Sequence, residues 1–448
     1  MADTEQSTQF PEFASESVYR SFLSNIAELP EGFLVSSGSI SFIPGERPTL
    51  EPYRMNLSAI ALVEPTPAFG GVFTRNAFPG APVILARKKI EGPLLRAILV
   101  NNKISNVRAA TGIQDAEKLV AALASELDGV GSLSGHSSSS AVTPEQLLSV
   151  STGIIGWRLP VPEMLDAIPE LVKNLHGESA LDVADAIMTT DSFPKVRRVT
   201  LGSGSMIGIA KGAGMIEPNM ATMLVFLLTD VTLERDQLRR SLKEAVDASF
   251  NRITVDSDQS TSDMAILLSS RRKPAVSQSE FDAALTALCR ELAEDVVRNG
   301  EGTGHVIRVT VGGLPEDAVA LAAAKAVVNS PLVKTAIYGN DPNVGRILGA
   351  LGDFAGNANI SIDPEQVRIS VGSEIVYGDG AFAIDRDKEM SLSEYLKSAA
   401  LNPRLRGYPQ HQRRVELAVS CGDGPGAGDA VGADLSDQYV RENADYRT

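Results

Sequence analysis

Short apolar runs alternate with longer amphipathic stretches along the whole of this chain, so its fold has to bury both kinds of segment. The runs at 97–100, 222–228 and 264–268 are typical of buried strands, because they are short and mainly aliphatic. The stretches 116–127 and 281–297 place apolar residues on one side of a helix. The connections vary in length and keep no steady strand–helix–strand rhythm. We therefore expect an α/β fold with stacked β-sheets between helical layers.

Further segments follow from the same periodicity. Val18, Phe22, Ile26 and Leu29 recur at helical spacing, which predicts a short helix before Pro30. Further strands are expected at 59–63, 72–74, 82–85, 196–201, 306–311, 367–371, 374–377 and 415–420, and further helices at 180–188 and 318–328.

Composition excludes several classes of partner. Of the 448 residues, 43% are hydrophobic, which is enough for a sizeable aliphatic core. The formal net charge of −15 argues against nucleic acid and anionic membrane surfaces as partners, because both attract basic patches. The amino terminus has neither the basic nor the apolar region of a signal peptide, and no apolar run approaches the roughly 20 residues that cross a bilayer. Composition thus favours a soluble cytoplasmic protein.

Cysteine and histidine are too scattered to suggest a metal site. Cys289 and Cys421 lie far apart, which predicts two free thiols in a reducing compartment. The four histidines are also dispersed, so we expect no metal and no cofactor.

Three polar segments suggest loops. Four glycines between 422 and 428 follow a strand, but no helical pattern comes after them and the acidic residues among them would repel a pyrophosphate, so we predict a mobile loop. The acidic run 256–263 has Thr261 and Leu267 where a calcium loop needs glycine and glutamate, which favours a hydrogen-bonded turn. The Gly- and Ser-rich stretch 129–140 predicts a surface loop.

The segment 211–224 carries the chemistry. It consists of a Gly-rich approach from Lys211, a Pro-Asn turn at 218–219, and Thr222 at the point where the turn meets an apolar strand. A hydroxyl at such a junction can face a cavity while the sheet holds its backbone. The plainer interpretation is a β-branched residue that begins a strand.

Residues 211–224 resemble the cleavage-site motif of the ornithine acetyltransferase (glutamate N-acetyltransferase) family. The resemblance, which extends from about Gly32 to Thr448, implies that the chain cuts itself between Ala221 and Thr222. The products would be an α chain of residues 1–221 and a β chain of residues 222–448, interleaved rather than independent domains. Cleavage would free an α-amine beside the Thr222 hydroxyl, with a pKa near the roughly 7.7–8.0 of a model amine, so that the amine can act as general base.

The same resemblance assigns residues to the reaction centre and to the carboxylate of the substrate. Thr152 and Gly153, in the run Ser-Thr-Gly-Ile-Ile-Gly, match the oxyanion-hole segment. Lys211 matches the lysine that binds the substrate carboxylate, and Thr189 matches a substrate-binding threonine. A structural salt bridge for Lys211 and a hydrogen bond at a helix end for Thr189 stay open as alternatives.

Residues of the carboxyl-terminal half complete the implied pocket. Glu301 matches the acid that receives the substrate's cationic amine, with a structural salt bridge as its alternative. Asn443 and Thr448 match residues that close the pocket.

The activity implied is transfer of an acetyl group from N-acetylornithine to glutamate, through acetyl-Thr222, in arginine biosynthesis. Acetyl-CoA stays open as a second donor, although the sequence has no separate CoA-binding signature. The resemblance also implies a fold similar to N-terminal nucleophile hydrolases with different connectivity, and a heterotetramer of two α and two β chains.

Two departures from the family pattern leave other activities open. The loop Asn101–Arg108 lacks the glycine of the family run Asn-Ser-Gly-Asn-Ala-Asn, and Val344 stands where the family typically has tryptophan. The alternatives are an acetyltransferase for a different amino acid, an N-terminal-threonine amidohydrolase or aminopeptidase, and a non-catalytic binding protein.

Overall fold

The computed structural model describes residues 12–48, 51–129, 141–217 and 223–444. The chain forms two compact units: a large unit, Leu23–Val296, and a small unit made of Met1–Phe22 and Val297–Thr448. The predicted cleavage junction between 221 and 222 falls inside the sequence of the large unit, so that unit includes segments from both sides of it. Helix α1 (Glu16–Ile26) and helix α7 (Gln278–Arg298) each cross a unit boundary in sequence.

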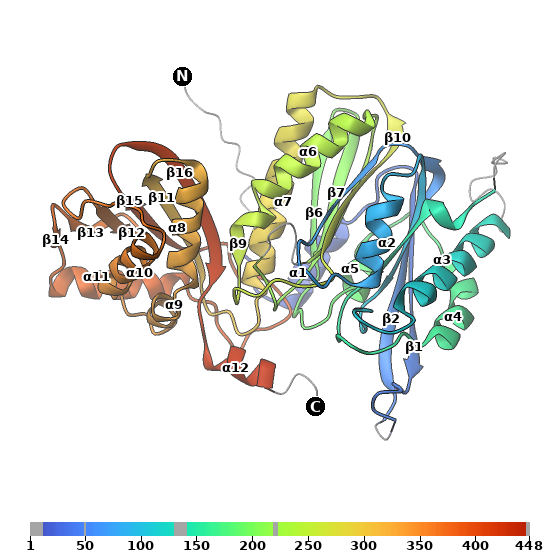
Figure 1. Cartoon of the computed structure of the whole chain (residues 1–448), viewed down its shortest axis with the longest axis horizontal. Helices are drawn as coiled ribbons and strands as arrows, with labels where there is room; N and C mark the ends of the chain where they lie inside the picture. The colour runs from blue at the N-terminus through green and yellow to red at the C-terminus, as the bar shows by residue number, and fades with distance from the viewer. Residues whose placement is uncertain (1–11, 49–50, 130–140, 218–222, 445–448) are drawn as a thin grey trace. The chain divides into compact units, whose positions relative to one another are not determined.

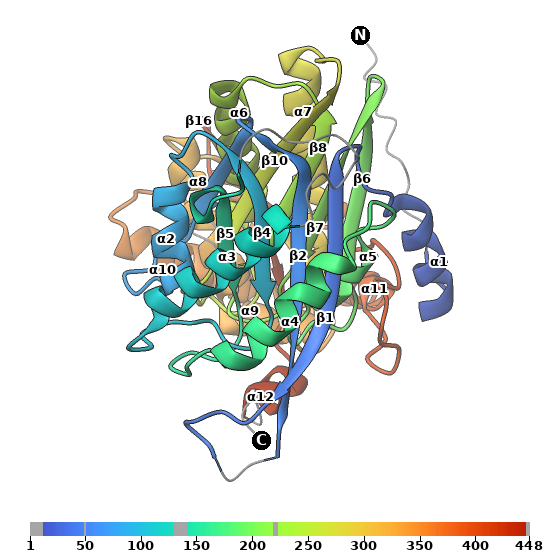
Figure 2. The ribbon, with the colours of Figure 1, turned by 90° about the vertical axis from the view of Figure 1, so that its right-hand side faces the viewer.

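The large unit contains two stacked sheets between helices. In the first sheet the strand order is β1-β2-β4-β5, antiparallel except for the parallel pair β4 and β5. Helices α3 and α4 cross its outer face, and the second sheet lies behind it (Figure 2). The bounds are β1 (Phe33–Phe42), β2 (Tyr53–Thr66), β4 (Leu95–Asn101), β5 (Leu147–Ser151), α2 (Ala81–Lys89), α3 (Gly112–Gly129), a short 3-10 turn at Pro144–Gln146, α4 (Val161–Lys173) and α5 (Leu181–Ala186).

The second sheet has the order β3-β10-β8-β7-β6. Its outer face is covered by α6 and α7, so that the layers run helix, sheet, sheet, helix (Figure 1). Gly208 on β7 lets α7 approach, because a Cβ at that position would lie only 2.5 Å from Leu292. The bounds are β3 (Phe69–Phe73), β6 (Lys195–Leu201), β7 (Gly204–Lys211), β8 (Leu224–Val231), α6 (Arg235–Asp247), a 3-10 turn at Phe250–Arg252, β9 (Ile253–Thr254) and β10 (Met264–Lys273).

The apolar runs occupy the middle of these layers. Strand β8 is buried at every residue, since β7 and β10 flank it and its two faces meet the other sheet and the helices. The predicted α/β architecture with stacked sheets between helical layers is therefore confirmed.

The small unit is built on one further sheet. Its strands run in the order β14-β13-β12-β15-β11-β16, and its core includes Val309 and Val311 of β11 and Leu417 of β15. The bounds are β11 (Val306–Gly313), α8 (Asp317–Asn329), α9 (Pro331–Tyr338), α10 (Val344–Asn357), β12 (Arg368–Val371), β13 (Glu374–Gly378), β14 (Ala381–Phe382), α11 (Arg386–Ala399), β15 (Val415–Ser420), β16 (Gly424–Ala433) and α12 (Asp437–Ala444).

Two local predictions were wrong. The segment 82–85 is not a strand but part of helix α2, which has a proline in its first turn, where the missing N–H costs nothing. The Gly-rich stretch after Cys421 is not a mobile loop but strand β16.

Backbone packing explains the strand of glycines. Helix α8 packs on β16, and a Cβ at Gly426 would lie 2.3 Å from the carbonyl carbon of Glu316. A Cβ at Gly428 would lie 2.4 Å from the amide nitrogen of Leu321. The glycines therefore remove side chains where a helix backbone lies directly on the strand.

Three other predictions have simple outcomes. Most of the predicted loop 129–140 lies outside the described residues. Cys289 and Cys421 are buried and form no disulfide. Among the described residues no helix is long and apolar enough to cross a bilayer.

Candidate active site

Four loops of the large unit gather near the ends of its central strands. They comprise 101–106 after β4, 151–156 after β5, 188–191 before β6, and 211–217 after β7. Strands β4 and β5 are parallel, so their carboxyl ends meet at one sheet edge. The Asn102 side chain then donates to the Met188 carbonyl at 2.8 Å, which joins the first of these loops to the third.

The predicted oxyanion segment continues the pairing of β4 with β5 beyond both strands. Thr152 N–H donates to the Asn101 carbonyl at 3.1 Å and Ile154 N–H donates to the Lys103 carbonyl at 2.9 Å. Gly153 lies between these two donors, and among the described residues its N–H takes no part in this ladder. Residues 101–103 therefore accept from the N–H groups on either side of Gly153 and not from the Gly153 N–H itself.

Gly153 can only be glycine in this geometry. Its φ of 115° lies in a region that L side chains rarely adopt, and a Cβ would lie 2.2 Å from the Lys103 carbonyl oxygen. Thr152 beside it is 7% exposed, so a hydroxyl and an amide N–H lie together at a largely buried position. Two adjacent preorganised donors of this kind can stabilise an oxyanion.

Loop 101–108, which departs from the family pattern, supports the oxyanion segment. The buried Asn101 donates to the Ser151 hydroxyl at 2.7 Å, and its Oδ1 accepts from Ile104 N–H at 3.1 Å. Loss of the family glycine therefore leaves a loop that still holds residues 151–154 through Asn101 and Lys103.

The structure brings Thr189 and Lys211 together. Lys211 at the end of β7 donates from Nζ to the Thr189 hydroxyl at 3.2 Å. Asp191 Oδ2 accepts from Thr189 N–H at 3.0 Å, and Asp191 Oδ1 accepts from Gly212 N–H at 2.7 Å. One carboxylate thus holds both segments that carry the predicted substrate-binding residues.

Asp191 is ionised although it is buried. Its Oδ1 lies 2.6 Å from Lys195 Nζ, and neither side chain has any exposed surface. Burial by itself would raise the pKa of Asp191, but the charges of Lys195 and Lys211, together with the hydrogen bonds that it accepts, lower that pKa well below its ordinary value.

The acidic run 256–263 is the turn that the sequence predicted. Asp256 accepts from Met215 N–H at 2.6 Å and from Ile216 N–H at 2.7 Å, and Ser257 has a positive φ. Met215 itself has a φ of 55°. Asp256 therefore fixes the backbone that leads from β7 into the predicted cleavage segment.

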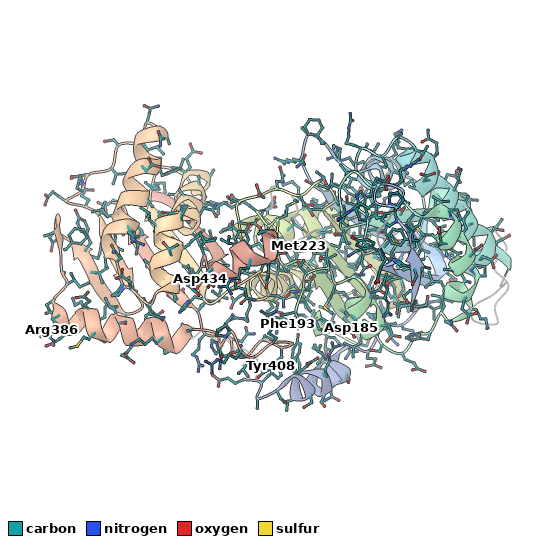
Figure 3. All side chains as sticks on the ribbon, turned by 90° about the horizontal axis from the view of Figure 1, so that it is seen from below. Asp185, Phe193, Met223, Arg386, Tyr408 and Asp434 are labelled. Carbon is teal, nitrogen blue, oxygen red and sulfur yellow. The ribbon has the colours of Figure 1, made fainter. Side chains whose placement is uncertain are left out.

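The predicted cleavage residues, Ala221 and Thr222, lie outside the described residues. Description resumes at Met223, whose carbonyl accepts from Met264 N–H at 3.1 Å; Met223 and Phe193 are labelled in Figure 3. The next residue, Leu224, pairs with Lys211 on one side and with Met264 on the other. The strand that follows the predicted nucleophile therefore begins beside Lys211.

Asp263 is a second buried carboxyl in this region. It precedes Met264, and its Oδ2 has no hydrogen-bond partner within the described part of the chain. Burial raises its pKa well above the ordinary value, although the Ser260 hydroxyl and Lys211 act in the opposite direction. Burial therefore favours the protonated form of Asp263, whereas the lysines favour the charged form of Asp191.

Glu301 and Asn443 belong to the small unit and lie together there. Glu301 follows α7 and is 8% exposed, and its Oε2 accepts from the Asn443 side chain on α12 at 2.8 Å. A cavity of about 660 Å³ is lined by the sequence neighbours of both residues, Gly302 and Glu442. Thr448 lies outside the described residues. Val344, which stands where the family typically has tryptophan, belongs to the buried core of this unit.

Several residues of the site were given no role from the sequence. Asp191 was visible beside Thr189, and Lys195 was detectable as the charge at the start of strand β6. Asn101 and Asp263 had no distinguishing local signal. Their roles depend on partners that are distant in sequence.

The chain is similar to known proteins over most of its length. The ArgJ family model matches residues 47–448. The arginine biosynthesis bifunctional protein ArgJ of Thermus thermophilus is 35% identical, over 94% of this chain and 99% of that protein. Glutamate N-acetyltransferase Oat2 of Streptomyces clavuligerus is 34% identical, over 94% of this chain and 98% of its own length. A crystal structure of the Bacillus halodurans arginine biosynthesis bifunctional protein ArgJ is 33% identical, with a TM-score of 0.44, and covers 50% of this chain and 100% of its own.

The extent of the family match and the relatives' coverage confirm both the resemblance found in the sequence and the assignment as an acyltransferase-type enzyme. The chain belongs to the ArgJ family.

Proposed function

We propose that the chain transfers an acetyl group from N-acetylornithine to glutamate in arginine biosynthesis, after cutting itself between Ala221 and Thr222. Membership of the ArgJ family supports the reaction class, and the Streptomyces clavuligerus relative is named a glutamate N-acetyltransferase. The structural observation that carries the proposal is the pair of donors at Thr152 and Gly153, held by β4 and β5 in the unit whose sequence contains Thr222.

The first half of the reaction forms an acetyl-enzyme. The Thr222 hydroxyl attacks the acetyl carbonyl while the Thr222 α-amine takes the hydroxyl proton. The Thr152 hydroxyl and the Gly153 N–H donate to the oxyanion that forms. The amide C–N bond then breaks, the α-ammonium returns its proton to the departing nitrogen, and ornithine leaves.

The second half reverses these steps with glutamate. Its amine attacks the acetyl ester of Thr222, the oxyanion forms between the same donors, and N-acetylglutamate leaves as the threonine hydroxyl is regenerated. Acetyl-CoA is a possible second donor for the same acetyl ester.

The α-carboxylate and the side-chain amine of ornithine are bound by different residues. Thr189 and Lys211 hold the α-carboxylate, because Lys211 brings a positive charge and its Nζ lies 3.2 Å from the Thr189 hydroxyl. Glu301, Asn443 and Thr448 receive the side-chain amine of ornithine, which the buried carboxylate of Glu301 can pair with. The α and β chains stay together after cleavage as a heterotetramer of two of each, in the cytoplasm.

Two measurements test the proposal together. The mass of the denatured protein should show two chains, with threonine at the amino terminus of the second. Purified protein should form N-acetylglutamate from N-acetylornithine and glutamate, with one ornithine released for each.

Thr222→Ala should abolish both cleavage and transfer, whereas Thr222→Ser, which keeps a hydroxyl, should retain part of each. An uncut chain with full transferase activity would refute the mechanism. Acetate release that glutamate leaves unchanged would refute transfer and favour an amidohydrolase.

A further inference from the structure

The buried pair of Asp191 and Lys195 lies directly behind the residues proposed to bind the substrate carboxylate. Asp191 contacts Lys195 at 2.6 Å and also accepts from the backbone N–H groups of Thr189 and Gly212. Lys211, the residue before Gly212, donates to the Thr189 hydroxyl. Asp191 therefore lies within the hydrogen-bonded surroundings of Lys211, and its negative charge acts on the same space.

Lys195 offsets the negative charge of Asp191 at close range. The Asp191 carboxylate lies 2.6 Å from Lys195 Nζ, and the charges of Lys195 and Lys211 both act on it. Burial raises the pKa of Asp263, the other carboxyl on which Lys211 acts, and so disfavours its charged form. Without Lys195, the negative charge of Asp191 would act on Lys211 with no offset from Lys195.

The position of Lys195 makes it a partner of Asp191 rather than of a substrate. Its side chain has no exposed surface, and its Nζ also donates to the Phe193 carbonyl at 3.4 Å. Burying a charged pair is costly, and a hydrophobic pair of similar size often gives equal or greater stability. A buried pair kept beside a ligand site therefore calls for a role other than stability.

We propose that Asp191 and Lys195 are positioning residues that set the charge of the carboxylate subsite. Lys195 neutralises Asp191, so that Asp191 can fix the Thr189 and Lys211 segments without lowering the attraction of Lys211 for an anion. The inference rests on the proposed function and specifies its substrate class: the subsite accepts one carboxylate and discriminates against a neutral group at that position.

The test compares two donors that differ only in charge at this subsite. N-Acetylornithine carries an α-carboxylate, and N-acetylornithine amide carries a neutral carboxamide in its place. For Lys195→Met, which removes the charge and keeps the length of the side chain, KM for N-acetylornithine should rise roughly 10-fold or more while kcat falls much less. KM for the amide should change by less than about 3-fold, because the neutral carboxamide is not attracted by the positive charge of Lys211.

A double variant separates charge from packing. Asp191→Asn combined with Lys195→Met removes one negative and one positive buried charge, so the net charge around Lys211 is that of the unaltered protein. Its KM for N-acetylornithine should be lower than that of Lys195→Met and closer to that of the unaltered protein. A packing role would predict the reverse order, since the double variant changes two buried side chains.

Equal rises of KM for both donors in Lys195→Met would overturn the proposal, as would a double variant that binds N-acetylornithine no better than the single variant. If Lys195→Met does not fold, the double variant carries the test, because it must keep the preference of the unaltered protein for carboxylate over amide. Failure of the unaltered, fully cleaved protein to transfer acetyl groups from N-acetylornithine would instead refute the proposed function. Intact mass confirms in every case that the same fraction of chains is cut.

Discussion

Replacing Gly153 by alanine should disable the oxyanion site with little effect elsewhere. The new Cβ would lie 2.2 Å from the Lys103 carbonyl oxygen, whereas ordinary contacts begin at 3.4 Å. The segment must therefore move by about 1 Å, and displacements of that size at a reaction centre can cost about 100-fold in rate. Loss of one oxyanion donor alone typically costs about 100- to 1000-fold, so we expect kcat to fall by at least about 100-fold.

Gly156 provides a matched control three residues away. It also has a positive φ, of 88°, but a Cβ there would meet nothing within 4 Å. Both substitutions carry backbone strain on the order of 1–3 kcal/mol, so both should lower the melting temperature. Only Gly153→Ala moves the donors, so only this variant should lose most of kcat.

The assay is the rate of N-acetylglutamate formation from N-acetylornithine and glutamate, expressed per cleaved chain from intact mass. Circular dichroism and thermal melting of both variants show how much folded protein contributes. If Gly153→Ala kept a kcat within about 3-fold of Gly156→Ala, residues 152–153 could not be the oxyanion donors, since a shift of this size would have to disturb them.

Three further changes have expected outcomes. Thr152→Val keeps the shape and removes the hydroxyl, so kcat should fall about 100-fold with KM unchanged, and steady-state kinetics showing less than about a 3-fold loss would exclude a donor role. Asp295→Ala removes the partner 2.6 Å from the buried Arg197 and should lower the free energy of unfolding by about 3 kcal/mol, measured with denaturant; a loss below about 1 kcal/mol would contradict that buried pair. Because burial raises the pKa of Asp263, the folded state binds more protons than the unfolded state above the ordinary pKa, so stability falls by about 1.4 kcal/mol per pH unit until the raised pKa is reached. Asp263→Asn should therefore stabilise the protein more at pH 7 than at pH 4 in denaturant unfolding, and a gain that does not vary with pH would disprove the raised pKa.

Local sequence patterns predicted a helix or strand correctly where one kind of burial extends along the whole segment. The apolar run that became β8 and the amphipathic stretch that became α3 were both predicted, because burial on two faces leaves an uninterrupted apolar run and burial on one stripe leaves a helical period. The pattern failed where long-range packing reversed local preference. At 424–433 glycines usually indicate a loop, yet here they allow the backbone of α8 to lie on strand β16.

The site divides in the same way. The sequence alone predicted Thr152, Gly153, Thr189 and Lys211 as site residues. Each lies in a family motif of adjacent residues, which can be compared with the chain position by position. Only the folded chain makes Asp191 a shared anchor of two segments, since Thr189 precedes β6, Gly212 follows β7, and the pairing of these strands brings the two residues together. Charge balance and buried hydrogen bonds depend on distances in space, and those distances are decided only when the strands pair within one sheet.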